Sequence, residues 1–327
     1  MSKSQQGSGD QRWHRPKIGI STCLLGEQVR YDGGHKLDRF LTNTFGQFVE
    51  WVPVCPEVEC GLPIPRESMR LEGDPEHPRL VTSRTRRDLT ERMVNWARKR
   101  LKELEKEDLC GFVFKSKSPS SGMERVKVFD KHGMPHKVGS GIFAGAFMKR
   151  FPLIPVEEDG RLHDPELREN FIERIFCLDR YRNMLRSDAT VKGLSDFHAK
   201  HKMLLMAHDS DITRKMGALV GQARGRQRDR LFAEYEAMMI KALSRKATRR
   251  KNANVLMHMM GYLKKHLTAD EKQEMLAIIS QYKEELIPLI VPVTLMSHYV
   301  RKHDEPYLKL QYYLNPHPIE LKLRNHA

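Results

Sequence analysis

The sequence has no uninterrupted apolar run that approaches the ~18 residues of a membrane-spanning helix. Hydrophobic residues make up 39% and charged residues 30% of its 327 residues, a balance typical of a globular protein. This length predicts two domains, each with its own hydrophobic core. The polar residues 1–16 lack the apolar centre of a signal peptide, so we expect them to form a disordered tail.

Cysteine is scarce, and its five positions fall into two groups. Without a secretory signal, so few thiols argue against a disulfide framework and predict a reducing, cytoplasmic location. Cys110 and Cys177 lie in apolar runs and are expected to be core residues. Cys23, Cys55 and Cys60 lie beside turn residues, a placement that favours metal or cluster ligation.

Several common cofactor motifs are missing. The spacing C-x31-C-x4-C has neither the paired C-x2-C elements of a zinc ribbon nor the close run of cysteines of a ferredoxin. The Ser-rich loop at 116–126 lacks the G-x4-G-K-S/T order of a P-loop. Three thiols from two strand ends suit an iron–sulfur cluster with one open iron, by analogy with catalytic metal sites. A set of reduced thiols without a cofactor is the alternative.

Strands and helices alternate through the first half of the chain. We expect strands at 17–22, 48–54, 110–115 and 151–156, and helices at 37–47 and 88–107. The alternation predicts a Rossmann-like α/β domain with a mostly parallel sheet over residues 17–160. Ligands of such sheets bind beyond the carboxyl ends of the strands. The residues that follow these strand ends, which we expect in one crevice, are Cys23, Cys55, Glu57, Cys60 and Ser118.

The stretch V-P-V-C-P-E-V-E-C-G-L-P-I-P-R-E at 52–67 combines two of the cysteines with four prolines and three glutamates. The prolines predict a stiff, extended, non-helical loop. In an extended segment Glu57 and Glu59 would point the same way. A carboxylate in a dry crevice beside a cluster could shuttle protons, a role we assign to Glu57. The structural alternative, a turn cap or a pair with Arg66, suits Glu59 better.

Strand signals largely stop after residue 160, and apolar residues at helical spacing predict an all-α domain over 161–327. The net charge is +15, and the stretch from His201 to Lys265 contains fifteen Lys and Arg but only five Asp and Glu. This concentration favours a nucleic acid partner over a membrane, with a solvated helical face as the alternative. The predicted RNA contacts are Arg224, Arg226, Lys241, Arg245, Arg249 and Arg250, of which 241, 245 and 249 are expected on one helical stripe.

Three motifs follow one another in the N-terminal half. They are S-T-C-L-L-G-E-Q-V-R-Y-D-G at 21–33, V-C-P-E-V-E-C-G-L-P-I-P-R-E at 54–67 and K-S-K-S-P-S-S-G-M-E-R-V at 115–126. Together they resemble the thiouracil desulfidases, iron–sulfur enzymes that remove sulfur from thiolated pyrimidines. The remainder resembles the helical YbgA-like domain. The fused arrangement is similar to that of the tRNA 4-thiouridine desulfidases, which return thiolated uridine in tRNA to uridine.

The resemblance implies a [4Fe-4S] cluster held by three cysteines, with the fourth iron free to capture the substrate sulfur. Cys23 and Cys55 match family ligands, but Ser121 stands where the family usually has the third cysteine. We expect Cys60 to replace that ligand. The family's catalytic glutamate and serine map to Glu57 and Ser118, which would handle protons and position the water that attacks the pyrimidine carbon before hydrosulfide leaves.

Three functions are therefore open at the level of sequence. The first is an enzyme that converts 4-thiouridine in tRNA to uridine, with the helical domain holding the RNA. The second is a non-catalytic RNA-binding or redox-sensing protein in which Ser121 marks a lost cluster. The third is a desulfidase of free 2-thiouracil, in which the helical domain serves another purpose.

Overall fold

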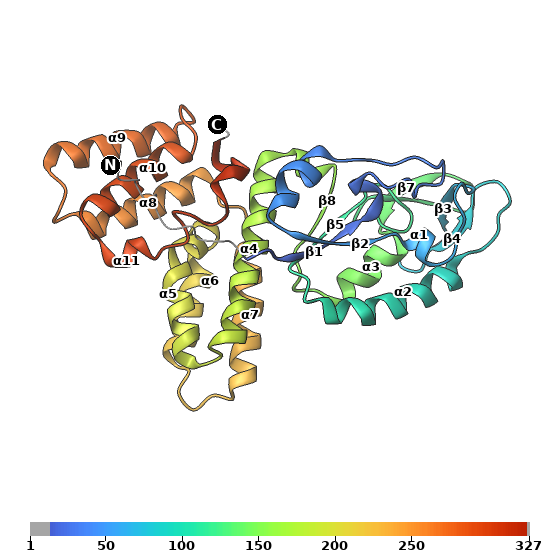
Figure 1. Ribbon diagram of the computed structural model, residues 1–327, viewed down its shortest axis with the longest axis horizontal. Helices are drawn as coiled ribbons and strands as arrows, with labels where there is room; N and C mark the ends of the chain where they lie inside the picture. Colours follow the sequence, from blue (N-terminus) through green and yellow to red (C-terminus); the bar gives the residue numbers. More distant parts are fainter. Residues whose placement is uncertain (1–13, 326–327) are drawn as a thin grey trace, which may run out of the picture.

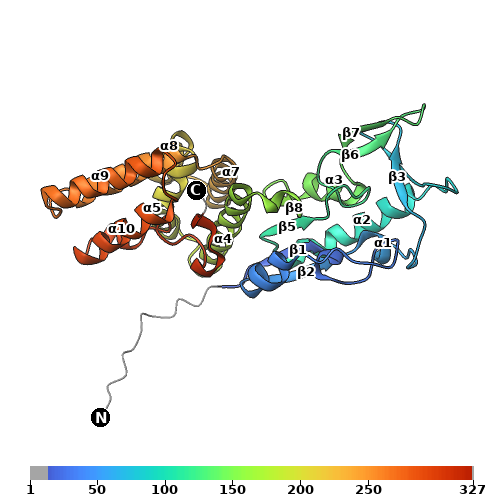
Figure 2. The same cartoon turned by 90° about the horizontal axis from the view of Figure 1, so that it is seen from above.

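A computed structural model describes residues 14–325 of the chain. An α/β region that contains all the described strands lies beside a helical region, and helix α4 (Pro165–Ser187) stands at their junction (Figure 1). Seen from above, the two regions extend in opposite directions from α4 (Figure 2). The predicted order of an α/β domain followed by an all-α domain is confirmed. Residues 1–13 of the predicted tail lie outside the described residues.

The central sheet is fully parallel, with strand order β2-β1-β5-β8. Its strands are β1 (Lys17–Ser21), β2 (Glu50–Val54), β5 (Gly111–Phe114) and β8 (Val156–Glu158). The strand expected at 151–156 begins only at its last residue. Phe151 instead ends helix α3 (Ile142–Arg150), and prolines at 152 and 155 withhold ladder donors from the segment between them.

A second sheet, which we did not predict, has the order β4-β3-β6-β7 and mixes parallel with antiparallel pairs. It consists of β3 (Met69–Glu72), β4 (Arg79–Thr82), β6 (Val126–Phe129) and β7 (Pro135–Gly139). Each strand is only four or five residues long, and most of β7 is exposed. Such short, charged strands carry little of the alternation by which a strand is recognised in a sequence.

The two faces of the central sheet are buried by different helices. On one face, Phe112 and Phe114 form an aromatic cluster with Phe143 and Phe147 of α3, and α2 (Thr90–Leu104) completes this core. On the other face, alternate residues such as Ile18 and Ile20 join the core of the helical region through α4. A side chain at Gly111 would meet Ile175 of α4 at 3.0 Å, so helix and sheet are in direct contact.

The helical region consists of α4, α5 (Val191–His208), α6 (Ser210–Gly221), α7 (Arg228–Leu243), α8 (Arg249–Leu263), α9 (Ala269–Lys283), α10 (Ile290–Lys302) and the short α11 (Pro306–Lys309). None of the helices within residues 14–325 combines the length and apolarity of a membrane span. The expectation of one helical stripe through 241, 245 and 249 is wrong, because α7 ends at Leu243 and a new helix begins at Arg249.

A buried charge network ties the C-terminal segment to α4. The Glu173 carboxylate accepts hydrogen bonds from Arg324 at 2.9 Å and pairs with His208 Nε2 at 3.0 Å, and Arg324 also contacts Glu169 at 3.3 Å. Burial acts to raise the pKa of Glu173, but the His208 hydrogen bond and the Arg324 charge outweigh it and hold that pKa well below its usual range. Burial and the neighbouring Glu173 carboxylate raise the pKa of Glu169. The network is therefore built around an ionised Glu173.

We expect Glu173→Gln to destabilise the protein by about 3 kcal/mol at neutral pH, because it removes the closer of the two carboxyl groups that contact the buried Arg324 charge and leaves only Glu169 beside it. The pKa of Glu173 is depressed in the folded state, so its contribution is present above the unfolded pKa of about 4.3 and is lost as pH falls below it. The difference between variant and wild type should therefore shrink in acid. Urea unfolding, followed by circular dichroism at pH 7 and below pH 4, measures both effects.

Glu166→Gln is the matched control on the same helix, since Glu166 pairs with Lys246 at the exposed surface. We expect this change to alter stability by less than about 1 kcal/mol. A Glu173→Gln protein as stable as the Glu166→Gln protein would contradict the assignment of a stabilising charge to Glu173.

Candidate active site

A pocket of about 400 Å³ lies at the carboxyl ends of β1, β2 and β5. Four of the five residues expected in one crevice line it: Cys23, Cys55, Glu57 and Ser118. Further lining residues come from the loops after the same strands, and they include Arg30, Arg66, Lys115 and Ser121. The pocket is therefore where the fold gathers most of the residues that the sequence singles out.

The two lining cysteines follow adjacent strands. Cys23 lies in a 3-10 turn, Thr22–Leu25, directly after β1. Cys55 directly follows β2 and is the N-cap of a short helix, α1 (Pro56–Glu59). The expectation of an extended, non-helical loop is wrong at this point, because Pro56 occupies the first helical position, where its fixed φ and missing N–H suit a helix start.

Glu57 and Glu59 consequently point to different partners. Glu57 Oε1 accepts a hydrogen bond from Ser120 Oγ at 2.6 Å, and its Oε2 lies 3.7 Å from Cys55 Sγ and 4.0 Å from Arg66 Nη2. Glu59 accepts the backbone N–H of Cys55 at 2.8 Å and pairs with Arg100 at 3.1 Å. The structural role expected for Glu59 is found with Arg100 as the partner, and Arg66 lies beside Glu57 instead.

The loop after β5 carries a chain of hydroxyl groups that ends on Glu57. Ser118 Oγ lies 3.0 Å from Ser120 Oγ, which donates to Glu57. Ser118 Oγ also accepts the backbone N–H groups of Ser120 and Ser121, at 3.3 and 3.2 Å. Ser120 is fully buried and joins the two residues that the sequence marked as catalytic. No local pattern distinguishes Ser120 from the other serines of the loop.

Close backbone packing fixes this serine loop. The Ser120 carbonyl accepts N–H groups from Phe143 and Ala144 in the first turn of α3. A Cβ at Gly141, just before α3, would lie 2.4 Å from the carbonyl carbon of Ser120. The absence of a side chain at Gly141 therefore permits the approach that holds Ser120 against Glu57.

Positive charge dominates the pocket. Its lining holds five Lys and Arg side chains (Arg30, Lys36, Arg66, Lys115 and Lys117), whereas Glu57 is its one carboxylate. Lys115 is fixed by Asp159 at 2.8 Å and by Ser116 Oγ at 2.9 Å. The Asp159 pKa is lowered, since the Lys115 and Ser116 contacts outweigh the opposing effect of burial. An excess of cations suits an anionic occupant, such as a group bound through thiolates.

Burial and the Glu57 carboxylate raise the pKa of Cys23 to about 11 and that of Cys55 to about 12. Both thiols therefore hold their protons at neutral pH in the metal-free chain. A soft metal would displace these protons on binding. Two soft donors on neighbouring strand ends, in a cationic pocket, fit an iron–sulfur group.

Cys60 is not among the residues that line the pocket. Its thiol donates to the backbone carbonyl of Glu57 at 3.2 Å and packs against a separate core cluster that includes Leu80 and Met93. Arg92 holds this segment by donating to the Cys60 and Gly61 carbonyls, both at 2.6 Å. The structure thus places Cys23 and Cys55 in the same pocket, whereas the Cys60 side chain packs against a separate core cluster.

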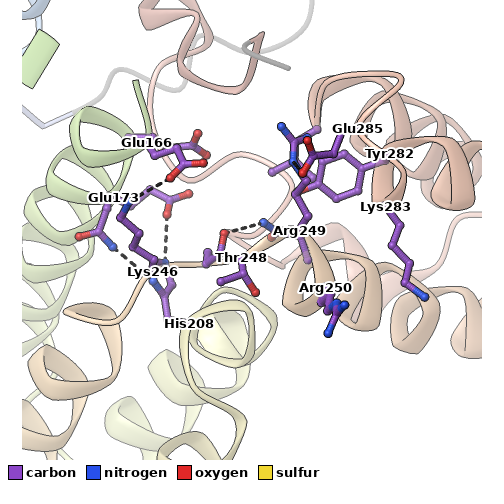
Figure 3. A pocket seen from close by; sticks show the side chains of 15 residues that line it. Glu166, Glu173, His208, Lys246, Thr248, Arg249, Arg250, Tyr282, Lys283 and Glu285 are labelled. Atoms are coloured by element: carbon purple, nitrogen blue, oxygen red, sulfur yellow. Dashed lines mark hydrogen bonds and ion pairs between the residues drawn. The ribbon is translucent and has the colours of Figure 1, made fainter. Parts of the chain in front are cut away.

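A second pocket, of about 520 Å³, lies in the helical region at the start of α8 (Figure 3). Beside it, Glu169, Glu173 and His317 bring metal-ligating atoms within 4.8 Å of one another. Both oxygens of Glu173 are already engaged by Arg324 and His208. The Arg324 charge takes the place that a metal ion would have, so this cluster is an ion-pair network.

The six predicted RNA contacts are distributed over two ends of α7. Arg224 and Arg226 precede this helix, whereas Arg245, Arg249 and Arg250 follow it, and its 16 residues span about 24 Å. Ion pairs hold three of the six: Arg226 with Glu234, Arg245 with Asp209 and Arg249 with Glu285. Within residues 14–325, no ion pair engages Arg224, Lys241 or Arg250.

Comparisons with known proteins divide the chain in two. Residues 18–159 match the family described as 2-thiouracil desulfurase, and residues 202–318 match a family described as protein of unknown function (DUF1722). The uncharacterized protein YbgA of Escherichia coli (strain K12) is 30% identical over 153 residues, which cover 46% of this chain and 90% of YbgA. A solved structure, the [4Fe-4S]-dependent thiouracil desulfidase TudS, is 28% identical with a TM-score of 0.39, and the match covers 48% of this chain and all of that one.

Gly141→Ala tests the packing that holds the serine loop. The added methyl group would collide with the backbone of Ser120, so we expect a loss of stability of about 1–3 kcal/mol. Gly261→Ala is the matched control, because a Cβ at that position in α8 meets nothing within 4 Å. The control should be neutral or stabilising by up to about 1 kcal/mol. Thermal unfolding of both variants decides the point, and equal effects would contradict the proposed contact.

Proposed function

We propose that this chain removes sulfur from a thiolated uracil base of tRNA. The chain belongs to the family of Escherichia coli YbgA, and its residues 18–159 match the family described as 2-thiouracil desulfurase. The observation that carries the proposal is the pocket at the ends of β1, β2 and β5. There, two thiols lie beside a carboxylate that is hydrogen-bonded to a chain of hydroxyl groups.

Cys23 and Cys55 would hold a [4Fe-4S] cluster in this pocket. When bound, the cluster supplies a soft metal centre for the sulfur of the substrate. The cationic lining favours the negative charge that thiolate ligands bring. It also suits the hydrosulfide that the reaction produces.

The overall reaction replaces sulfur by oxygen without a change of oxidation state. Water adds to the pyrimidine carbon that carries the sulfur, the C–S bond breaks, and sulfur leaves as hydrosulfide. No external reductant or oxidant is required, since the water oxygen becomes the carbonyl oxygen of uracil. The protein therefore has to place a water molecule and remove its protons.

Glu57 would take a proton from that water. Ser120 fixes Oε1 of the carboxylate, which leaves Oε2 on the side of Cys55 and Arg66. Ser118 lines the pocket, and the N–H groups of Ser120 and Ser121 orient its hydroxyl oxygen. Ser118 and Glu57 thus act as one hydrogen-bonded unit, with Ser120 as the positioning residue between them.

The helical region supplies the cations for the RNA part of the proposal. Arg224, Lys241 and Arg250 are the predicted contacts whose charge no described residue neutralises by an ion pair, which makes them suited to bind phosphate. Contacts of this kind provide affinity and position without sequence specificity. The alternative substrate, free 2-thiouracil, would not require these side chains.

Anaerobic reconstitution with iron and sulfide, followed by incubation with 4-thiouridine-containing tRNA, tests the activity. We expect loss of 4-thiouridine and one hydrosulfide for each base converted. Glu57→Gln should lower kcat by about 10²–10⁴, the usual range for a lost acid–base group, while iron content stays unchanged. Ser120→Ala should retain more activity than Glu57→Gln. A colourless wild-type protein that holds no iron would rule the function out.

Charge reversal separates tRNA from the free base as substrate. Lys241→Glu combined with Arg250→Glu should weaken tRNA binding and reduce the slope of its salt dependence by about 2, because two phosphate contacts are lost. Turnover of free thiouracil should not change. Lys131→Glu with Lys137→Glu, on the exposed β6–β7 hairpin, is the control of equal charge change. If wild type converts thiouracil and leaves tRNA unchanged, the substrate is the free base.

A further inference from the structure

The position of the third protein ligand can be inferred from the strand order of the central sheet. Because β1 lies between β2 and β5, the loops after these three strands meet at one edge. Cys23 follows β1 and Cys55 follows β2. The loop after β5 closes the remaining side of the pocket, and it contains no cysteine.

Cys60 is a poor third donor, although it is the nearest remaining thiol in the sequence. Its Sγ is hydrogen-bonded to the carbonyl of Glu57 and lies against the core cluster formed by β3, β4 and α2. Moving this thiol into the pocket would break that bond and displace a segment that Arg92 holds by two hydrogen bonds. Such a rearrangement would also disturb Glu57 itself.

The loop after β5 offers hydroxyl groups instead, and most are engaged. Ser116 Oγ accepts from Lys115 Nζ, and Ser118 Oγ accepts two backbone N–H groups. Ser120 donates to Glu57 and is not a lining residue. Ser121 differs from these three: it lines the pocket, is 3% exposed, and its hydroxyl has only a 3.4 Å contact, to Ser120 Oγ.

We propose that the side-chain oxygen of Ser121 is the third protein ligand of the cluster, together with the thiolates of Cys23 and Cys55. This inference rests on the proposed function. As the iron–oxygen bond forms, the hydroxyl proton leaves to solvent, and no electron is transferred. An alkoxide is a harder donor than a thiolate, so the iron that it binds is held less firmly than the two held by sulfur.

The test compares iron binding in four proteins reconstituted anaerobically with iron and sulfide: wild type, Ser121→Ala, Ser121→Cys and Cys60→Ala. Iron and sulfide per chain, the visible absorption spectrum and the rate of iron loss to a chelator are measured. Loss of the ligand in Ser121→Ala should accelerate iron loss by on the order of tenfold or more. Ser121→Cys should slow it and change the thiolate-to-iron absorption. Cys60→Ala should behave as wild type.

Each outcome decides the proposal. If Ser121→Ala keeps its iron as wild type does and Ser121→Cys leaves the spectrum unchanged, Ser121 is not a ligand. If Cys60→Ala alone loses iron, Cys60 is the third ligand, and in both cases the desulfidase function still stands. If wild type itself takes up no iron, the proposed function fails along with the ligand. Circular dichroism checks that all four proteins are folded, and the two Ser121 variants give independent answers.

Discussion

The pairing of β1 with both β2 and β5, in parallel, is the constraint on which the rest of the site depends. It places three successive carboxyl ends at one edge, and each end passes directly into a loop or turn with a chemically active side chain. Parallel strands require crossovers, and α2 and α3 serve as crossover helices that bury the aromatic face of the sheet. The candidate active-site pocket thus follows from the same topology that produces the core.

The hydrogen bond from Ser120 to Glu57, a residue of the pocket lining, joins the loop after β5 to α1 across 63 residues of the chain. One end of the bond depends on the short helix that begins at Pro56, and the other depends on the close approach of Gly141 to the serine loop. The carboxylate is therefore oriented by backbone geometry on both sides. A flexible loop would leave its direction undetermined.

The sequence predicted the alternation of strands and helices well, because long periodic segments such as α2 carry a strong apolar pattern. It also predicted that Cys23, Cys55, Glu57 and Ser118 would line one crevice, since each follows a strand end. The sequence did not predict the second sheet, because its strands are short and partly charged. It also did not predict the helix at Pro56, because proline suits a helix start as well as a turn. Ser120 and the direction of Cys60 depend on contacts between distant segments, which no local pattern records.

Helix α4 fixes the position of the helical region relative to the α/β region. The cluster that contains Ile18 and Ile20 of the sheet continues through α4 into α5, α7 and α8, so one core spans both regions. Neither region can swivel on the other without exposing that shared core. The two regions are therefore better regarded as one rigid unit than as two modules joined by a flexible linker. For the tRNA proposed as the substrate, binding to the helical region would hold the RNA at a set distance from the pocket, so only a nucleotide at that distance along the folded RNA would reach it.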